Sequence, residues 1–272
     1  MKEKVLVLDI DGTLTNSKKE ISPATKQGIS ETLKRGHKVI LASGRPTPGM
    51  RRYEEELELD QYDGYLLSFN GARIVECKSG EIVYQRTLPP MVIPGLYAFA
   101  KEHGCGLITY LGDHVISAFE PDEYIELESR INGMDVRVEE NFVEFVDFDV
   151  NKCLMTAPVE KAPGLEKLLQ KKYGDMLSIY RSEPFFIEIM PQNVDKAASL
   201  DRMLETVGLT KEDAICCGDG FNDLTMIQYA GLGVAMGNAQ PVVKEAADIV
   251  TGTNDEDGLV PVIEKFILNR EG

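Results

Sequence analysis

The sequence has few of the residues that build metal centres and disulfide frameworks. Its 272 residues include no tryptophan, only three histidines and only five cysteines. The histidines (His37, His103 and His114) lie far apart and the cysteines form no CxxC pair, so neither a zinc motif nor a disulfide framework is indicated. An odd number of cysteines without a secretion signal is typical of reduced thiols in a cytosol, so we expect a cytoplasmic protein.

Long hydrophobic runs and positive charge are also scarce. No segment approaches the ~18 apolar residues that a membrane helix needs, and the first apolar run, residues 5–8, is too short for a signal peptide. Lysine and arginine number 29 against 45 acidic residues, which gives a net charge of −16. Because this balance repels polyanions, neither nucleic acid nor a membrane is expected as a partner. A small anionic substrate would need a site that reverses the field locally.

Both ends of the chain alternate short apolar runs with amphipathic segments. Before residue 85 this alternation predicts strands at residues 5–8, 37–42, 65–69, 73–76 and 81–85. After residue 190 it predicts strands at residues 214–217, 233–235 and 249–250. Helices are expected between the strands; Ser22 can cap the first one, and Pro23 suits its first turn. Repeated strand–helix units predict an α/β fold whose parallel sheet is covered on both faces.

The middle of the chain has a different pattern. Its strands are shorter and more alternating, at residues 115–119, 135–138, 152–156 and 185–190. Helices are expected at residues 92–103, 122–131 and 161–173, the last with Leu165, Leu168 and Leu169 as its buried stripe. This is a mixed α+β pattern. We therefore predict a core made of residues 1–84 and 191–272, with a second domain, residues 85–190, inserted between the two parts.

Polar residues gather where the predicted core strands end. Four sets stand out: Asp9-Ile10-Asp11-Gly12-Thr13, Ser43-Gly44-Arg45, Gly218-Asp219-Gly220-Phe221-Asn222-Asp223, and Lys196 at the start of a helix. Ligands of open α/β sheets bind beyond the carboxyl ends of the strands, so a parallel sheet would bring these sets to one edge. A single carboxylate in such a turn usually caps a helix or is solvated. Two pairs of carboxylates, each directly after an apolar strand, favour a functional cluster instead.

Such a cluster needs positive charge. Two carboxylates about 4 Å apart repel by about 4 kcal/mol at an effective dielectric constant of ~20, and three or four cost several times as much. An all-oxygen site with few protein ligands suits Mg²⁺, which keeps waters and accepts phosphate oxygens of a substrate. The ion would also supply local positive charge to this acidic chain. Lys196 and the Ser43 hydroxyl could hold the remaining phosphate oxygens.

The first motif has the groups that phosphate transfer requires. A carboxylate can attack phosphorus and form an aspartyl-phosphate. Two residues after Asp9, Asp11 has the reach to protonate the leaving alkoxide and then to take a proton from the attacking water. Gly12 allows a tight turn, and Thr13 offers a hydroxyl that can orient the carboxylates. Phosphate-monoester hydrolysis is so slow without a catalyst that enzymes accelerate its rate by up to ~10²¹-fold. A metal ion, a lysine and in-line positioning of the reacting atoms are the effects that can produce an acceleration of this size.

In order and spacing, these four motifs resemble those of the haloacid dehalogenase (HAD) superfamily. The Asn70-Gly71-Ala72 turn, the place of the insert and the segment 231–258 resemble its Cof-type branch of sugar-phosphate phosphatases. The resemblance implies a Rossmann-like core with an inserted cap that selects the substrate. It implies the following roles: Asp9 as nucleophile, Asp11 as general acid and base, Mg²⁺ bound by Asp9, the Asp11 carbonyl and Asp219, phosphate bound by Ser43, Gly44, Lys196 and Asn222, and support from Thr13, Asp223 and Arg45.

We therefore expect a Mg²⁺-dependent phosphatase that acts on small phosphorylated metabolites, with sugar phosphates as the leading class. Two alternatives use the same atoms. A phosphomutase would pass the aspartyl-phosphate to a second hydroxyl, and a regulatory phospho-acceptor would keep it; the latter needs neither Asp11 nor an insert of about a hundred residues. The sequence leaves the substrate and the oligomeric state open.

Overall fold

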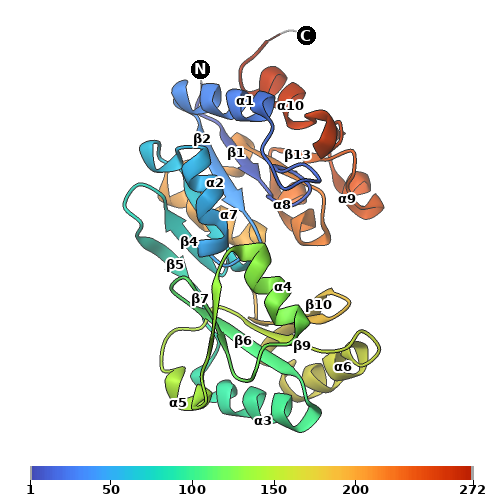
Figure 1. The fold of residues 1–272 in the computed structure, drawn as a ribbon. Helices are drawn as coiled ribbons and strands as arrows, with labels where there is room; N and C mark the ends of the chain where they lie inside the picture. The colour runs from blue at the N-terminus through green and yellow to red at the C-terminus, as the bar shows by residue number, and fades with distance from the viewer. Residues whose placement is uncertain (1, 271–272) are drawn as a thin grey trace. The chain divides into compact units, whose positions relative to one another are not determined.

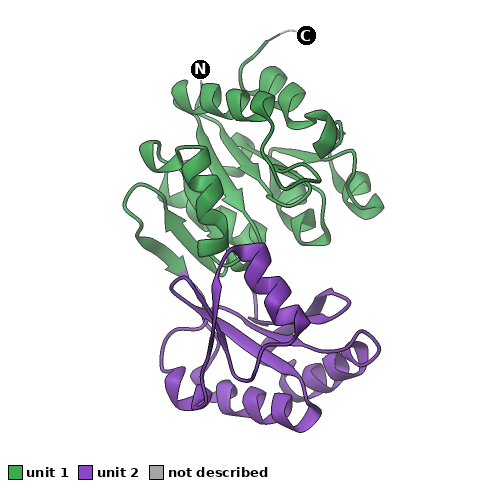
Figure 2. Ribbon diagram, in the orientation of Figure 1, with its two compact units in different colours: residues 1–84, 195–272 green, residues 85–194 purple. Residues whose placement is uncertain are grey.

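The structure, a computed structural model, describes residues 2–270, which form two compact units (Figures 1 and 2). The first unit combines the residues up to Tyr84 with those from Asp195 onward, and the second is Gln85–Val194. The second unit thus ends four residues later than the expected boundary at residue 190. One reason is that the Gln192 amide donates a hydrogen bond to the Gly174 carbonyl (2.7 Å) and so stays with the insert.

The first unit is built on an eight-stranded sheet with the order β14-β13-β12-β1-β2-β3-β4-β5. The six strands from β14 to β3 are parallel, β4 runs antiparallel to β3, and β5 is the strand at the other edge. Its strands are β1 (Val5–Leu8), β2 (Lys38–Ala42), β3 (Tyr65–Ser68), β4 (Arg73–Glu76), β5 (Ile82–Gln85), β12 (Ala214–Gly218), β13 (Leu232–Ala235) and β14 (Ile249–Val250). Its α-helices are α1 (Pro23–Lys34), α2 (Pro48–Glu56), α7 (Lys196–Thr206), α8 (Leu224–Tyr229), α9 (Pro241–Ala246) and α10 (Leu259–Phe266).

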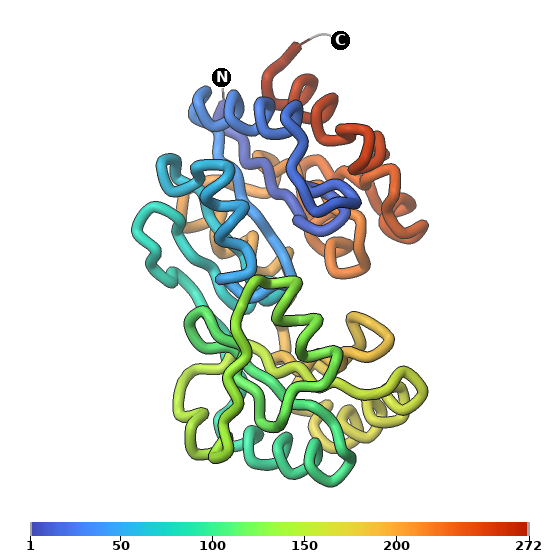
Figure 3. The backbone as a smooth tube through the Cα atoms, viewed as in Figure 1, coloured from blue at the N-terminus to red at the C-terminus, as the bar shows by residue number. Residues whose placement is uncertain are grey.

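Strand β1 is fully buried because helices cover both faces of the sheet. Leu6 and Leu8 belong to the core shared with α1 and α10, whereas Val5 and Val7 belong to the core shared with α7 and α8. The two ends of the chain therefore build one unit, with α1 and α10 side by side (Figure 3). The predicted α/β fold with a Rossmann-like parallel core is confirmed.

The second unit is an α+β unit with a six-stranded sheet in the order β10-β11-β9-β6-β7-β8. Its strands are β6 (Gly106–Leu111), β7 (His114–Ser117), β8 (Asp135–Val138), β9 (Cys153–Thr156), β10 (Leu177–Glu183) and β11 (Phe186–Pro191). Its α-helices are α3 (Ile93–His103), α4 (Glu123–Asn132), α5 (Phe142–Phe145) and α6 (Ala162–Tyr173). Four expectations were incomplete or wrong, one of them being that α5 was not predicted. β6 and β10 were not predicted, and Leu168 of α6 is 49% exposed rather than buried.

A buried ion pair joins the residue before β9 to strand β11 in the second unit. Lys152 Nζ lies 3.1 Å from Glu188 Oε2, and the two side chains are only 4% and 9% exposed. Burial alone would lower the pKa of Lys152, but the Glu188 charge raises it above its usual value. The Ser182 hydroxyl donates to the other Glu188 oxygen (2.8 Å), so the carboxylate is held by a charge and a hydrogen bond.

Replacing Lys152 by methionine is expected to lower the free energy of unfolding by about 3–5 kcal/mol, because an uncompensated carboxylate would stay buried. Urea denaturation of the purified variant measures the loss. The double variant Lys152→Met/Glu188→Leu removes both charges and should recover most of it. Equal losses in the single and double variants would contradict the role of charge.

No helix among the described residues is both long and apolar enough to cross a bilayer. All five cysteines are buried and unpaired.

Candidate active site

The candidate site lies where the strand order reverses. β1 is flanked by β12 and β2, and Leu8 is level with Cys217 on one side and Leu41 on the other. The loops that follow these three strands therefore start at the same height at the carboxyl edge of the sheet. Reversal points of this kind are where open α/β sheets bind their ligands.

Three carboxylates and one lysine meet at this edge. One carboxylate oxygen each from Asp9, Asp219 and Asp223 lie within 4.8 Å of one another. Lys196, the first residue of α7, sends its ammonium between two of them, 2.6 Å from Asp9 Oδ1 and 2.5 Å from Asp223 Oδ1. Its side chain is 0% exposed, so this charge belongs entirely to the cluster. Asp195 caps α7 by accepting from the Ala198 amide and so fixes the start of this helix.

The first loop is shaped by its glycine. Gly12 has φ +88°, and a Cβ there would lie 2.5 Å from Asp219 Oδ2, so only glycine fits between the two loops. Thr13, the next residue, donates its hydroxyl to Asp219 Oδ1 (2.9 Å). The two roles expected for Gly12 and Thr13, a tight turn and orientation of a carboxylate, agree with this geometry.

Asp223 is a structural partner of the loop after β12. Its Oδ2 accepts from the backbone N–H groups of Asp219 (3.0 Å) and Gly220 (2.9 Å), while its Oδ1 binds Lys196. Its side chain is 0% exposed. With both oxygens engaged, Asp223 holds the lysine and the loop rather than offering a ligand position.

The cluster has too little positive charge. Burial raises the pKa of Asp9 well above its usual range, and the Asp223 charge adds to this against the opposing Lys196 charge. Burial likewise raises the pKa of Asp219 to about 6, although the Thr13 hydrogen bond opposes it. The pKa of Lys196 is raised because Asp223 and Asp9 outweigh its burial. A further cation would relieve all three carboxylates.

Asp11 lies outside this cluster of carboxylates, with its side chain in a cationic setting. Arg45 Nε donates to Oδ2 (2.7 Å) and Arg45 Nη2 to Oδ1 (2.9 Å), and Lys19 Nζ also donates to Oδ1 (2.9 Å). Burial would raise the pKa of Asp11, but these two cations lower it to about 2. Any contribution of Asp11 to a metal site would therefore come from its backbone carbonyl, as the family resemblance implies.

The other predicted phosphate-binding residues lie in neighbouring loops. The Ser43 hydroxyl, 3% exposed, accepts from the Arg45 backbone N–H (3.2 Å). Asn222 Nδ2 donates to Asn70 Oδ1 (3.1 Å), which links the loop after β12 to the loop after β3. A Cβ on Gly44 would lie 3.1 Å from that same oxygen, so Gly44 lets the loop after β2 approach the loop after β3.

Three residues at the site were not predicted from the sequence. Lys19 binds Asp11, Asn238 Nδ2 donates to the Gly12 carbonyl (2.8 Å), and Asn254 Nδ2 donates to the Thr15 carbonyl (2.9 Å). For Asn238 a signal existed, because the Gly237-Asn238 turn follows β13 as the other motifs follow their strands. Lys19 and Asn254 lie in polar turns and carry no such signal.

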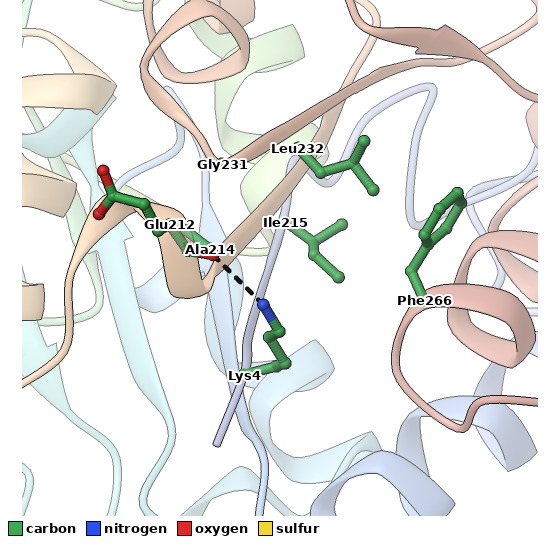
Figure 4. A pocket seen from close by; sticks show the side chains of 7 residues that line it. All are labelled: Lys4, Glu212, Ala214, Ile215, Gly231, Leu232 and Phe266. Atoms are coloured by element: carbon green, nitrogen blue, oxygen red, sulfur yellow. Dashed lines mark hydrogen bonds between the residues drawn. The ribbon is translucent and has the colours of Figure 1, made fainter. Parts of the chain in front are cut away.

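A separate cavity of about 200 Å³ lies at the opposite edge of this sheet (Figure 4). Its walls include Lys4, which precedes β1, the first residues of β12 and β13, and Phe266 of α10. The Lys4 ammonium donates to the Glu212 carbonyl (3.2 Å). Because this cavity is at the amino ends of the strands, it is not part of the site.

The doubly wound sheet and the buried cluster at its reversal point place the chain among the α/β enzymes that work at the carboxyl edge of a parallel sheet. The family comparison is more specific. The profile of the haloacid dehalogenase-like hydrolases matches residues 6–263, so the chain belongs to this family. The resemblance predicted from the four motifs is confirmed.

Individual relatives agree with this membership. The chain is 31% identical over 265 residues to a 5-amino-6-(5-phospho-D-ribitylamino)uracil phosphatase, YcsE, of Bacillus subtilis, across 97% of this chain and 96% of that one. A crystal structure of a haloacid dehalogenase-like hydrolase from Bacteroides thetaiotaomicron superimposes with a TM-score of 0.94 at 42% identity, covering 97% and 99%. The HAD subclass IIB sugar phosphatase BT4131 superimposes with a TM-score of 0.81 at 25% identity, covering 97% and 98%. The chain is thus an enzyme of the phosphatase type.

Proposed function

We propose that the protein is a Mg²⁺-dependent phosphatase that hydrolyses small phosphorylated metabolites through an aspartyl-phosphate on Asp9. The observation that carries this proposal is the Asp9–Lys196–Asp223 cluster, in which a nearly buried carboxylate at the end of β1 is held 2.6 Å from a fully buried ammonium. A carboxylate in this position is oriented for attack, and the ammonium can stabilise the phosphate oxygens that develop charge.

The residues present fit a magnesium ion. Asp9 Oδ2 and Asp219 Oδ2 accept no hydrogen bond from any described residue, whereas both Asp223 oxygens are engaged. Asp9, Asp219 and the Asp11 carbonyl would hold the ion, and all three are hard oxygen ligands. When bound, Mg²⁺ would neutralise the acidic cluster and polarise the phosphate oxygens. The raised pKa values of Asp9 and Asp219 show that their ionised forms are disfavoured, and a bound cation would stabilise those forms.

The reaction then takes two balanced steps. In the first, an Asp9 oxygen bonds to phosphorus and the bond between phosphorus and the leaving oxygen breaks. Asp11 gives that oxygen a proton, for which its carboxyl must first leave the Arg45 and Lys19 ion pairs that lower its pKa. In the second, water attacks the phosphorus of the aspartyl-phosphate, Asp11 takes its proton, and the Asp9–phosphate bond breaks. Inorganic phosphate leaves and both aspartates return to their starting forms. Ser43, Gly44, Lys196 and Asn222 would bind the phosphate oxygens.

We propose that the second unit, Gln85–Val194, selects the substrate. Sugar phosphates are the first class to consider, since BT4131 is a sugar phosphatase. The relative YcsE acts on a phosphorylated ribitylaminouracil, which also carries its phosphate on a polyol chain. We further propose a cytosolic location, which the five unpaired cysteines support.

A panel assay tests this function. Purified protein with Mg²⁺ should release inorganic phosphate from at least one sugar phosphate or phosphorylated cofactor, and chelation with EDTA should abolish the release until Mg²⁺ is restored. Formation of an isomeric sugar phosphate without free phosphate would indicate a mutase instead. A protein phosphorylated for minutes without turnover would indicate a phospho-acceptor, and full activity in EDTA would exclude the metal.

A further inference from the structure

The turn formed by residues 69–71, directly after β3, has an unusual backbone. Phe69 and Asn70 both have a left-handed conformation, with φ +52° and φ +54°, and Gly71 follows with φ +93°. Glycine and asparagine adopt such angles readily, but a bulky residue such as phenylalanine rarely does. Strained backbones of this kind persist only where the surrounding structure holds them, and they cluster at functional sites. The strain therefore indicates a function for the 69–71 turn.

The 69–71 turn contacts each segment that carries a proposed phosphate-binding residue. The Asn70 N–H donates to the Ser43 carbonyl (2.9 Å), in the loop after β2. Asn70 Oδ1 accepts from Asn222 Nδ2 (3.1 Å), in the loop after β12. The Gly71 carbonyl accepts from the buried hydroxyl of Ser199 (2.7 Å), on α7. One short turn thus joins three segments that are far apart in the sequence.

The contact between the 69–71 turn and α7 requires a glycine. A Cβ on Gly71 would clash with the Ser199 hydroxyl and would lie 3.0 Å from the Asp195 carbonyl oxygen. Asp195 caps α7, and Lys196 is the first residue of that helix. The turn therefore lies tightly against the end of α7 that supplies the buried ammonium, and this packing fixes the position of Asn70.

Among the proposed phosphate-binding side chains, Asn222 depends most on this turn. Lys196 is held between two carboxylates, and the Ser43 hydroxyl is buried and accepts from the Arg45 N–H. Asn222, in contrast, is exposed, and its side chain makes one hydrogen bond with the described residues, the one to Asn70. Without that bond, nothing in the described part of the chain would fix the direction of the Asn222 amide.

We propose that Asn70 is a positioning residue for phosphate binding, whose Oδ1 holds the Asn222 amide in place to donate to a phosphate oxygen. This inference rests on the proposed phosphatase function and deepens it. A side-chain amide has two N–H donors, so one can bind Asn70 while the other binds phosphate. Because the phosphate group is present in the substrate as well as in the transition state, losing this contact should weaken binding more than it slows the chemical step.

The test compares Asn70→Gly with the unmodified full chain in Mg²⁺. Glycine keeps the left-handed backbone and the N–H that binds Ser43, so only the side chain is lost. Two quantities are measured: the kinetics on 4-nitrophenyl phosphate, and the dissociation constant of inorganic phosphate by calorimetry. Loss of one hydrogen bond to a charged group weakens binding by about tenfold, so KM and the dissociation constant should each rise by about that factor. The kcat should change less than about threefold.

Asn193→Gly is the matched control, because it makes the same substitution at an exposed asparagine with the same left-handed backbone (φ +58°). Its KM, kcat and phosphate affinity should equal those of the unmodified protein. A purely structural role of Asn70 would instead lower the unfolding temperature and kcat of Asn70→Gly while leaving its phosphate affinity unchanged. That result, or the same loss of affinity in Asn193→Gly, would overturn the proposal.

A double-mutant cycle tests whether Asn70 acts through Asn222. Asn222→Ala should weaken phosphate binding at least as much as Asn70→Gly does, and the double variant Asn70→Gly/Asn222→Ala should bind phosphate no more weakly than Asn222→Ala. Additive losses would show that Asn70 acts independently of Asn222 and would overturn the positioning role. If the unmodified protein neither releases phosphate from 4-nitrophenyl phosphate nor binds inorganic phosphate, the proposed function fails before any variant is compared, and this inference falls with it.

Discussion

Asp9→Asn is expected to lower phosphatase turnover by roughly 10⁴-fold or more, as loss of a nucleophile does in enzymes that form covalent intermediates. Asparagine has nearly the size of aspartate, but its amide cannot form the acyl-phosphate that the proposed mechanism needs. The fold should survive the change. Asp9 is 5% exposed and shares its site with two other carboxylates, so the substitution removes one buried negative charge from a cluster with too little positive charge.

Phosphate release from 4-nitrophenyl phosphate measures this effect, with thermal unfolding as the check on folding. Asp60→Asn, which makes the same chemical change at an exposed position, is the matched control and should keep full activity. A folded Asp9→Asn variant that retains a tenth of the turnover would rule out covalent catalysis at Asp9.

The sequence predicts an element of the fold reliably where its residue pattern is compatible with only one kind of structure. The run at residues 5–8 is apolar at every position, which requires burial on both faces, and β1 is the strand between β12 and β2. The Ser22-Pro23 pair also behaves as its chemistry predicts. The Ser22 side chain accepts from the Thr25 amide, and Pro23 is the first residue of α1.

Of the two strands missed in the second unit, β10 is only partly buried. β10 has the sequence Leu-Ser-Ile-Tyr-Arg-Ser-Glu and lies at the edge of its sheet, where only Leu177 and Ile179 are buried. Such a strand has too few apolar residues to stand out from a loop. Leu168 shows the reverse error, because helical spacing places it beside Leu165 and Leu169 while the face it occupies is exposed to solvent. Periodicity identifies a helix better than it identifies the edge of the buried face.

At the candidate site, the sequence predicts the contacts that motifs bring together and misses those made by turns. The ammonium of Lys196 meets Asp9 across 187 residues of sequence, and this pairing follows from the parallel sheet. The Lys19–Asp11 pair is only eight residues apart, yet a lysine in a polar turn has the appearance of a solvated charge. Its contact depends on the left-handed backbone at Lys19, which no residue type at that position indicates.

Lys196→Met is expected to impair both stability and turnover. The ammonium is fully buried between Asp9 and Asp223, so its loss leaves two buried carboxylates without a neutralising charge and should lower the free energy of unfolding by about 3–5 kcal/mol. Loss of a charge that stabilises developing phosphate charge should lower kcat by about 10²–10³-fold or more. Urea denaturation and phosphate release measure the two effects on one preparation. Lys211→Met, which removes an exposed lysine before β12, should show neither.

The two readouts separate the structural role of Lys196 from its catalytic one. If the lysine only balanced the charge of Asp223, then Lys196→Met/Asp223→Asn would recover both stability and turnover. If it also binds phosphate, stability should recover in part while kcat stays low, because no other ammonium reaches Asp9 among the described residues. Turnover within threefold of the unmodified protein in the folded single variant would contradict any role of Lys196 in the reaction.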